Sequence, residues 1–145
     1  MALPEPVPGL VLRYAYLWRR ERDEGRDEGR KDRPCAIIAA VRSVETGVAR
    51  VLVLPVTHSP PEDPAAAVEL PLRVKRRLSL DDAPSWVNLS EWNDFVWPGP
   101  DLRRVPGRDD GSVAYGVLPP ALFAVIRDRF AALVRRRAAR PVARG

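Results

Sequence analysis

A cation, two hydroxyls and an imidazole stand at the ends of two apolar runs that a single turn joins. Arg33 precedes the first run, and Thr57, His58 and Ser59 follow the second. If the runs pair antiparallel about the turn at 45–47, paired residue numbers sum to about 90 to 92, which brings Arg33 near the other three. Directly opposed residues have Cβ atoms about 4.5–5.5 Å apart, so these side chains would share one end of a sheet. A cluster of this kind suits a phosphodiester.

The register of this hairpin decides which side chain faces Arg33. The lowest of these sums sets Thr57 beside Arg33, and the next sets His58 there, because a one-residue slip turns every side chain to the opposite face. The sequence leaves both registers open. It also leaves open a simpler interpretation, in which Arg33 is a solvated charge at a strand end and Thr57 and Ser59 form a turn before the following prolines.

Few residues are suited to bind a metal or a cofactor. His58 is the only histidine and Cys35 the only cysteine, which excludes an internal disulfide and a transition-metal site made of several such side chains. Cys35 is predicted to be a small core residue. The candidate magnesium ligands show no recognisable spacing; they are Asp81, Asp82, Glu91 and Asp94. No glycine-rich phosphate loop follows a predicted strand, so we expect neither a metal nor a cofactor.

Short strands are predicted to surround the cluster. Residues 10–17 are rich in β-forming side chains, and the two runs of the hairpin form the next strands. Further strands are expected at 66–70, 86–89, 94–97 and 112–115, with one or two helical turns at 72–80. Several short strands separated by turns are typical of a small barrel or sandwich.

The last predicted element is a helix over 119–140, followed by a basic tail at 141–145. The helix begins at two prolines and carries an apolar stripe at helical spacing: Leu122, Phe123, Ile126, Phe130, Leu133 and Val134. We expect the stripe to cover the strands rather than to form a partner groove. The predicted fold is therefore mainly β, a small SH3-like barrel with a C-terminal helix.

Charge and hydropathy limit the classes of partner. The net charge is +5, and residues 127–145 hold seven arginines and one aspartate. These arginines either bind phosphates or form a solvated helix end that favours the helix dipole. No apolar stretch approaches the ~20 residues that span a bilayer, and residues 1–9 lack a signal-peptide pattern. We expect a single cytoplasmic domain over residues 1–145, with no membrane partner.

At the hairpin the chain resembles the MazF/PemK family of toxin endoribonucleases. In that family the second strand typically begins with Arg-Pro before an aliphatic run, as at Arg33-Pro34, and the third ends in an apolar run closed by Thr, as at Thr57. Residues 8–11 are a weaker similarity, because the family tends to have Gly-Asp before an aliphatic residue there. The likeness spans residues 9–93, and the C-terminal helix matches in position only.

The resemblance implies an SH3-like barrel of the MazF/PemK/CcdB type and a homodimer that binds RNA between its subunits. It also implies a toxin–antitoxin system, in which the chain is a growth-inhibiting endoribonuclease and its partner is a cognate antitoxin protein. The expected reaction is attack of the substrate's own 2′-hydroxyl on the adjacent phosphorus of single-stranded RNA.

Three residues are the expected catalytic groups of this reaction. Arg33 would stabilise charge on the phosphoryl oxygens, because its planar fork matches two of them at once. Thr57 would position a phosphate oxygen or relay a proton. His58, which the resemblance does not carry, is the side chain suited to acid–base transfer near neutral pH, where such groups contribute roughly 10²- to 10⁴-fold in rate. The alternative is a structural histidine at a strand end.

The charged segment 18–32 has no apolar periodicity and is predicted to be a mobile loop. In the family, the loop at this place lies over the RNA groove, and the antitoxin can displace it. Here it is either a solvated linker or a lid that orders on RNA. Within it, Trp18, Arg19 and Lys31 are expected to bind RNA, together with Ser59 after the hairpin.

Base recognition needs stacking surfaces and hydrogen-bonding edges. Trp18, Trp92 and Trp97 flank predicted loops and would offer the first, unless they are core residues, and Glu91 and Asn93 would offer the second. Where relatives often carry Gln-x-Arg-Thr, residues 90–94 read Ser-Glu-Trp-Asn-Asp, so the family's extra arginine is absent.

Two other classes of function stay open. The domain is alternatively a non-catalytic SH3-like binding module or an inactive relative. It is also compatible with a poison of a protein target, as the related CcdB toxins are of gyrase.

Overall fold

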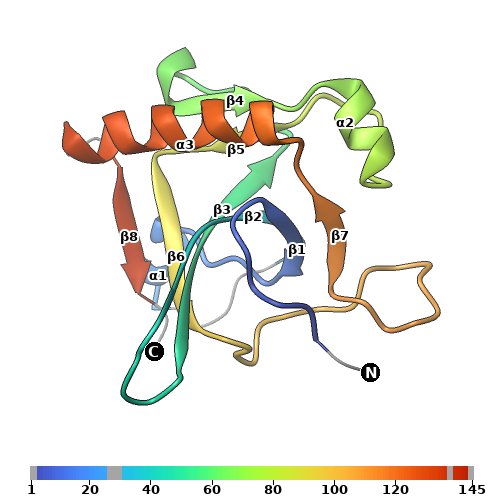
Figure 1. The fold of residues 1–145 in the computed structure, drawn as a ribbon. Helices are drawn as coiled ribbons and strands as arrows, with labels where there is room; N and C mark the ends of the chain where they lie inside the picture. Colours follow the sequence, from blue (N-terminus) through green and yellow to red (C-terminus); the bar gives the residue numbers. More distant parts are fainter. Residues whose placement is uncertain (1–2, 26–30, 137–138, 144–145) are drawn as a thin grey trace.

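The computed structural model describes residues 3–25, 31–136 and 139–143. Their secondary structure is drawn in Figure 1. The elements in chain order are β1 (Leu10–Tyr14), α1 (Arg19–Asp23), β2 (Arg33–Arg42), β3 (Ala49–Thr57), a 3-10 turn η1 (Pro64–Ala66), β4 (Ala67–Glu69), α2 (Leu72–Arg77), β5 (Trp86–Asn88), β6 (Glu91–Val96), β7 (Ala114–Val117), α3 (Pro120–Arg135) and β8 (Arg140–Ala143). No helix among the described residues is long and apolar enough to cross a bilayer.

The strands form one sheet in which β3 is central. Along one edge β3 pairs with β2, and along the other it pairs first with β6, through residues 50–53, and then with β5, through Val56 and Thr57. β1 and β7 continue the sheet beyond β2, and β4 continues it beyond β5. The predicted mainly β fold with a helix near the C-terminus is confirmed. Within the described residues, however, the sheet is open, with β4 and β7 at its ends.

A β-bulge divides the β2–β3 hairpin into two registers. At the end near Arg33, Cys35 pairs with Pro55 and Ile37 with Val53, and this register, continued outward by two residues, sets Arg33 across from Thr57. The pairing shifts by one residue after Ile37, so the half nearest the turn follows the other register that the sequence allowed. The bulge thus determines that Thr57, and not His58, lies across from Arg33.

The two faces of the sheet bury separate apolar clusters. Val51 and Val53 of β3 face one cluster, and Leu54 and Val56 face the other, as the period of a strand requires. α2 and α3 cover the second cluster, and Figure 1 shows α3 crossing the sheet over β5. The buried residues of α3 are Ile126, Phe130 and Leu133. Burying a side chain of this size stabilises by roughly 1.5–3 kcal/mol, so the predicted apolar stripe holds α3 on the sheet.

Cys35 belongs to the first cluster and is fully buried. Its burial raises the pKa of the thiol, so the side chain stays protonated as a core residue. This is the place that the sequence predicted for it.

The C-terminal helix is shorter than predicted. α3 ends at Arg135, and Arg140–Ala143, which the sequence placed in the helix end and the basic tail, form β8 parallel to β6. Pro141 explains the difference, because it has no N–H for a helix and favours extended backbone at the residue before it. Ala139 and Val142 are buried, so this segment packs against the rest of the protein.

Part of the charged segment is a helix rather than the predicted loop. α1 occupies Arg19–Asp23, and the backbone N–H of Trp18 donates to the Glu21 carboxylate at 3.1 Å. Glu91 of β6 accepts from the backbone N–H of Arg19 at 3.0 Å. Local capping and one contact with the sheet therefore order the start of a segment that has no apolar periodicity. The middle of the predicted loop, residues 26–30, lies outside the described residues.

Candidate active site

A cleft of about 630 Å³ opens at the end of the hairpin where β2 begins and β3 ends. Six of the nine predicted site residues line it: Trp18, Lys31, Arg33, Thr57, His58 and Ser59. Trp86 of β5 lines it as well, beside the paired Thr57. The sequence did not single out Trp86, because a tryptophan at the start of a short strand is indistinguishable from a core residue.

Arg33 is held at the wall of this cleft by two contacts. Its Nη1 donates to the carbonyl of Val56 at 3.4 Å, and its guanidinium carbon lies 5.1 Å from the centroid of the Trp18 ring. Its Nε is buried and has no hydrogen-bond partner among the described residues. A guanidinium carries five N–H donors, and within the described part of the chain its Nη groups keep donors that an anion in the cleft could use.

Thr57 and Ser59 form a tight turn directly after β3. The Thr57 Oγ1 accepts the backbone N–H of Ser59 at 3.1 Å. A hydroxyl has one proton to donate beside its acceptor lone pairs. The Thr57 hydroxyl is therefore oriented by this bond and keeps its proton for a ligand oxygen.

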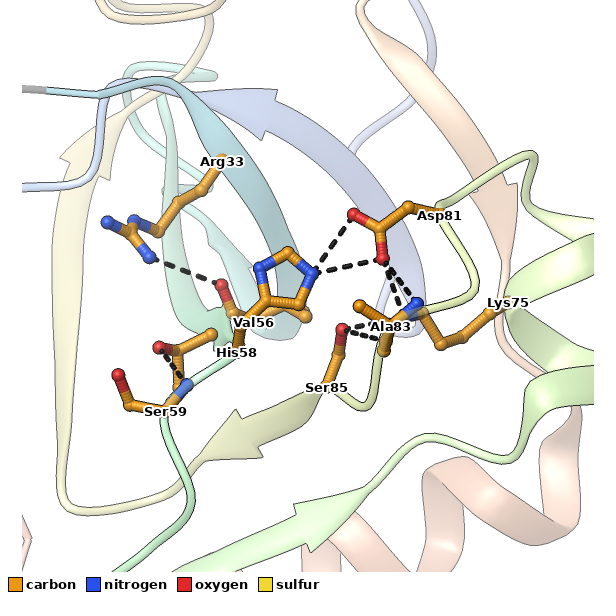
Figure 2. Close-up of polar contacts among 9 residues, drawn as sticks. Arg33, Val56, His58, Ser59, Lys75, Asp81, Ala83 and Ser85 are labelled. Atoms are coloured by element: carbon orange, nitrogen blue, oxygen red, sulfur yellow. Dashed lines mark hydrogen bonds and ion pairs between the residues drawn. The ribbon is translucent and has the colours of Figure 1, made fainter.

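His58, the residue after Thr57, contacts an aspartate. Its Nε2 is 3.0 Å from both carboxylate oxygens of Asp81, and Figure 2 shows the ring between Asp81 and Arg33, with one nitrogen directed toward each side. The hydrogen bond to His58 is the main cause that lowers the pKa of Asp81. Both side chains are more than half exposed, so the ring is reachable from the cleft.

A buried lysine holds Asp81 in place. Lys75 of α2 is 2% exposed, and its Nζ donates to Asp81 Oδ1 at 3.0 Å, to Ser85 Oγ at 2.7 Å and to the carbonyl of Ala83. These three acceptors match the three N–H donors of an ammonium. Figure 2 shows the resulting row of side chains from Lys75 through Asp81 to His58.

The sequence did not assign a role to Asp81 or Lys75. Both lie more than fifteen residues from His58 along the chain, and no spacing rule connects them. One signal was present, because Lys75 is one of only two lysines among 24 basic residues. A compact ammonium fits an enclosed site with three converging acceptors better than a guanidinium does.

Three of the predicted RNA-binding residues do not line the cleft, namely Arg19, Glu91 and Asn93. Asn93 is fully buried, and its amide makes two hydrogen bonds with the backbone of Leu17, at 2.9 and 2.8 Å. Glu91 accepts from the Tyr16 hydroxyl and from the backbone N–H of Arg19, and burial is the main cause that raises the pKa of Glu91. These contacts tie the chain before α1 to β6 and thereby position Trp18.

The other predicted stacking residues are partly buried and pack against the two apolar clusters. Trp92 makes an edge-to-face contact with Phe130 of α3 at 5.1 Å between ring centroids. Trp97 lies against Phe95 at 6.2 Å. Neither tryptophan lines the cleft, so the core alternative describes their contacts.

A second pocket of about 440 Å³ adjoins the cleft. Arg33, His58 and Lys31 line both, which places them at the boundary between the two spaces. Arg13, Arg108 and Tyr115 contribute to the wall of the second pocket. Within the described residues, no three His, Cys, Asp or Glu side chains gather to hold a metal ion.

The arrangement offers an anion-binding guanidinium, a hydroxyl proton and an oriented imidazole around one space. No protein-family model matches the chain, and no curated protein matches its sequence.

Proposed function

We propose that this chain is a metal-independent endoribonuclease that cleaves single-stranded RNA, with the SH3-like barrel architecture of the MazF/PemK toxins. The observation that carries the proposal is the convergence of Arg33, Thr57 and His58 on one cleft, with Thr57 across from Arg33 in the hairpin register. This is a set of groups that can bind a phosphodiester, donate a hydrogen bond to it and move a proton.

In the proposed reaction, the 2′-oxygen of a ribose attacks the adjacent phosphorus while the bond to the 5′-oxygen breaks. Arg33 binds the phosphoryl oxygens, where negative charge increases in the transition state. The Thr57 hydroxyl donates a hydrogen bond to one of the same oxygens and keeps its proton. His58 accepts the proton of the 2′-hydroxyl, and the departing 5′-oxygen takes a proton from solvent. The products are a 2′,3′-cyclic phosphate and a 5′-hydroxyl.

Two features support RNA as the substrate. DNA lacks the 2′-hydroxyl, so the proposed reaction is specific for RNA. The boundary position of Arg33 and His58 also suits a phosphate that joins two nucleosides, one in each pocket. Trp86 and the Arg-stacked Trp18 give the cleft an aromatic wall, and bases in single strands stack on such side chains.

The biological role that goes with this activity is a growth-inhibiting toxin. The chain would act in the cytoplasm as a homodimer and be neutralised by a cognate antitoxin protein. Its N-terminal charged segment would be displaced from the RNA groove by that partner. These expectations follow from the resemblance of the hairpin to the MazF/PemK family.

The test is to incubate the purified protein with a long single-stranded RNA in EDTA and to map the new ends. We expect discrete cuts that leave 5′-hydroxyl termini, and we expect Arg33→Ala to abolish them without changing the thermal unfolding temperature by more than a few degrees. Cleavage that requires Mg²⁺ would contradict the mechanism. An intact RNA would favour a non-catalytic binding module, or a gyrase-type poison if DNA topology changes in cells.

A further inference from the structure

Among the described residues, His58 is held through one ring nitrogen, Nε2. The cause of the lowered pKa of Asp81 is its hydrogen bond to this ring, so the aspartate is ionised near neutral pH and can only accept. The proton in the 3.0 Å contact therefore belongs to Nε2 of His58. In the neutral ring the other nitrogen, Nδ1, then carries a lone pair, and it lies on the side of the ring that faces Arg33 in Figure 2.

Asp81 is itself prevented from turning away. Its Oδ1 accepts from Lys75 Nζ at 3.0 Å and from the backbone N–H of Ala83 at 3.1 Å. Lys75 is buried and uses its other donors on Ser85 and Ala83. The exposed Asp81 carboxylate is thus held in place by the buried side chain of Lys75, which belongs to α2.

We propose that Asp81 is a positioning residue that keeps the proton of neutral His58 on Nε2 and directs Nδ1 as a base toward the space beside Arg33, and that Lys75 anchors Asp81 for this purpose. The inference rests on the proposed ribonuclease function and adds to it the orientation of the base. When Nδ1 takes the proton of the 2′-hydroxyl, the ring becomes a cation that Asp81 stabilises. The proton later passes from the ring to solvent.

The variant Asp81→Asn tests this arrangement with little change in shape. Lys75 and the Ala83 N–H both donate, so they retain the amide oxygen, and the amide NH₂ takes the place of the carboxylate oxygen Oδ2. Nε2 is 3.0 Å from both oxygens of the native carboxylate, so in the variant it faces one neutral oxygen and one NH₂ group. This change weakens the preference for a proton on Nε2, and the rings that carry the proton on Nδ1 instead no longer offer a base to the cleft. The matched control is Asp82→Asn, because Asp82 is the neighbouring exposed aspartate and pairs with Arg76 instead.

Because His58 is the only histidine, the ¹⁵N spectrum of the ring needs no further assignment. In the native protein and in Asp82→Asn, we expect a neutral ring protonated on Nε2 with a bare Nδ1. In Asp81→Asn we expect a larger share of rings protonated on Nδ1 than in the native protein. An Asp81→Asn spectrum identical to that of the native protein would overturn the inference, whatever the activity.

Kinetics separate positioning from a structural role. We expect Asp81→Asn to lower kcat about 10- to 100-fold with KM unchanged, which is less than the roughly 10²- to 10⁴-fold contribution of an acid–base group itself. In a His58→Gln background, Asp81→Asn should change kcat less than twofold, because Asp81 acts through the ring. Equal effects in both backgrounds would overturn the inference. Absence of cleavage by the native protein would overturn the proposed function and the catalytic part of this inference. The ¹⁵N spectrum would still decide whether Asp81 determines which nitrogen of the His58 ring carries the proton.

Discussion

The guanidinium of Arg33 lies over the ring of Trp18, with 5.1 Å between its carbon and the ring centroid. Trp18 is the residue that precedes α1, and it is positioned by the contacts of Glu91 and Asn93 with the neighbouring backbone. A chain of packed groups therefore connects β6 to the guanidinium. The two residues that were expected to read bases instead set the position of the proposed anion-binding group.

Replacing Arg33 by lysine should remove most of the cleavage activity. A lysine keeps the charge but loses the planar fork that binds two phosphoryl oxygens, so we expect the single-turnover rate to fall about 10²- to 10³-fold. The control is Arg42→Lys, at the opposite end of the same strand, where the side chain is exposed. A similar loss in both variants would show that the strand, and not the cleft, had been damaged.

The variant Thr57→Val should slow cleavage about tenfold, the effect of losing one hydrogen bond of roughly 1.4 kcal/mol. Valine has the same shape as threonine but neither a hydroxyl proton to donate nor an acceptor for the Ser59 N–H. Thr46→Val is a close control, because its Oγ1 accepts the N–H of Val48, two residues on, at 3.2 Å. Cleavage rates with a short RNA decide the comparison, and an unaffected Thr57→Val would remove Thr57 from the mechanism.

The variant Lys75→Met should destabilise the protein, because it removes the three hydrogen bonds of a buried ammonium and leaves the Ser85 hydroxyl and the Ala83 carbonyl with only the bond between them. A hydrogen bond to a charged group contributes about 1.5–3 kcal/mol, and we expect a decrease of that size in the free energy of unfolding measured in urea. Lys31→Met is the control, because Lys31 is exposed. Equal unfolding curves for the native protein and Lys75→Met would contradict the role of the buried ammonium.

The raised pKa of Glu91 predicts that the free energy of unfolding depends on pH. Burial raises the pKa of Glu91 in the folded state above its value in the unfolded chain, so the folded protein binds this proton more tightly. Its contribution is fully present below the unfolded pKa and is lost as the pH rises through the folded pKa. The native protein should therefore lose stability relative to Glu91→Gln as the pH rises through this window. Urea unfolding at a series of pH values measures the difference, and a constant difference would contradict the assigned cause.

The sequence predicted the part of the site that one hairpin carries. Arg33, Thr57, His58 and Ser59 are close along two paired strands, so a turn and a register suffice to bring them together. Residue types and strand periodicity likewise predicted the mainly β fold, the buried Cys35 and the apolar face of α3.

The contacts that the sequence did not predict depend on tertiary packing. Asp81 meets His58, and Lys75 meets Asp81, only through the tertiary packing of α2 and the residues after it near the end of β3. Trp86 reaches the cleft only through the pairing of β5 with Thr57. β8 was missed because four residues with one proline carry no strand periodicity of their own. Their strand exists because β6 offers an edge with which they can pair.

The β-bulge after Ile37 has a consequence for engineering and for divergence. A change in length at the hairpin tip, residues 43–48, would shift the strand pairing in the half of the hairpin between the tip and the bulge. The bulge already separates the pairing of this half from that of the half near Arg33. We therefore expect this tip to accept an inserted epitope or a fluorescent label without a change in the pairing that sets Arg33 across from Thr57. Length variation at that tip is a form of sequence drift that leaves the pairing at the end with Arg33 unchanged.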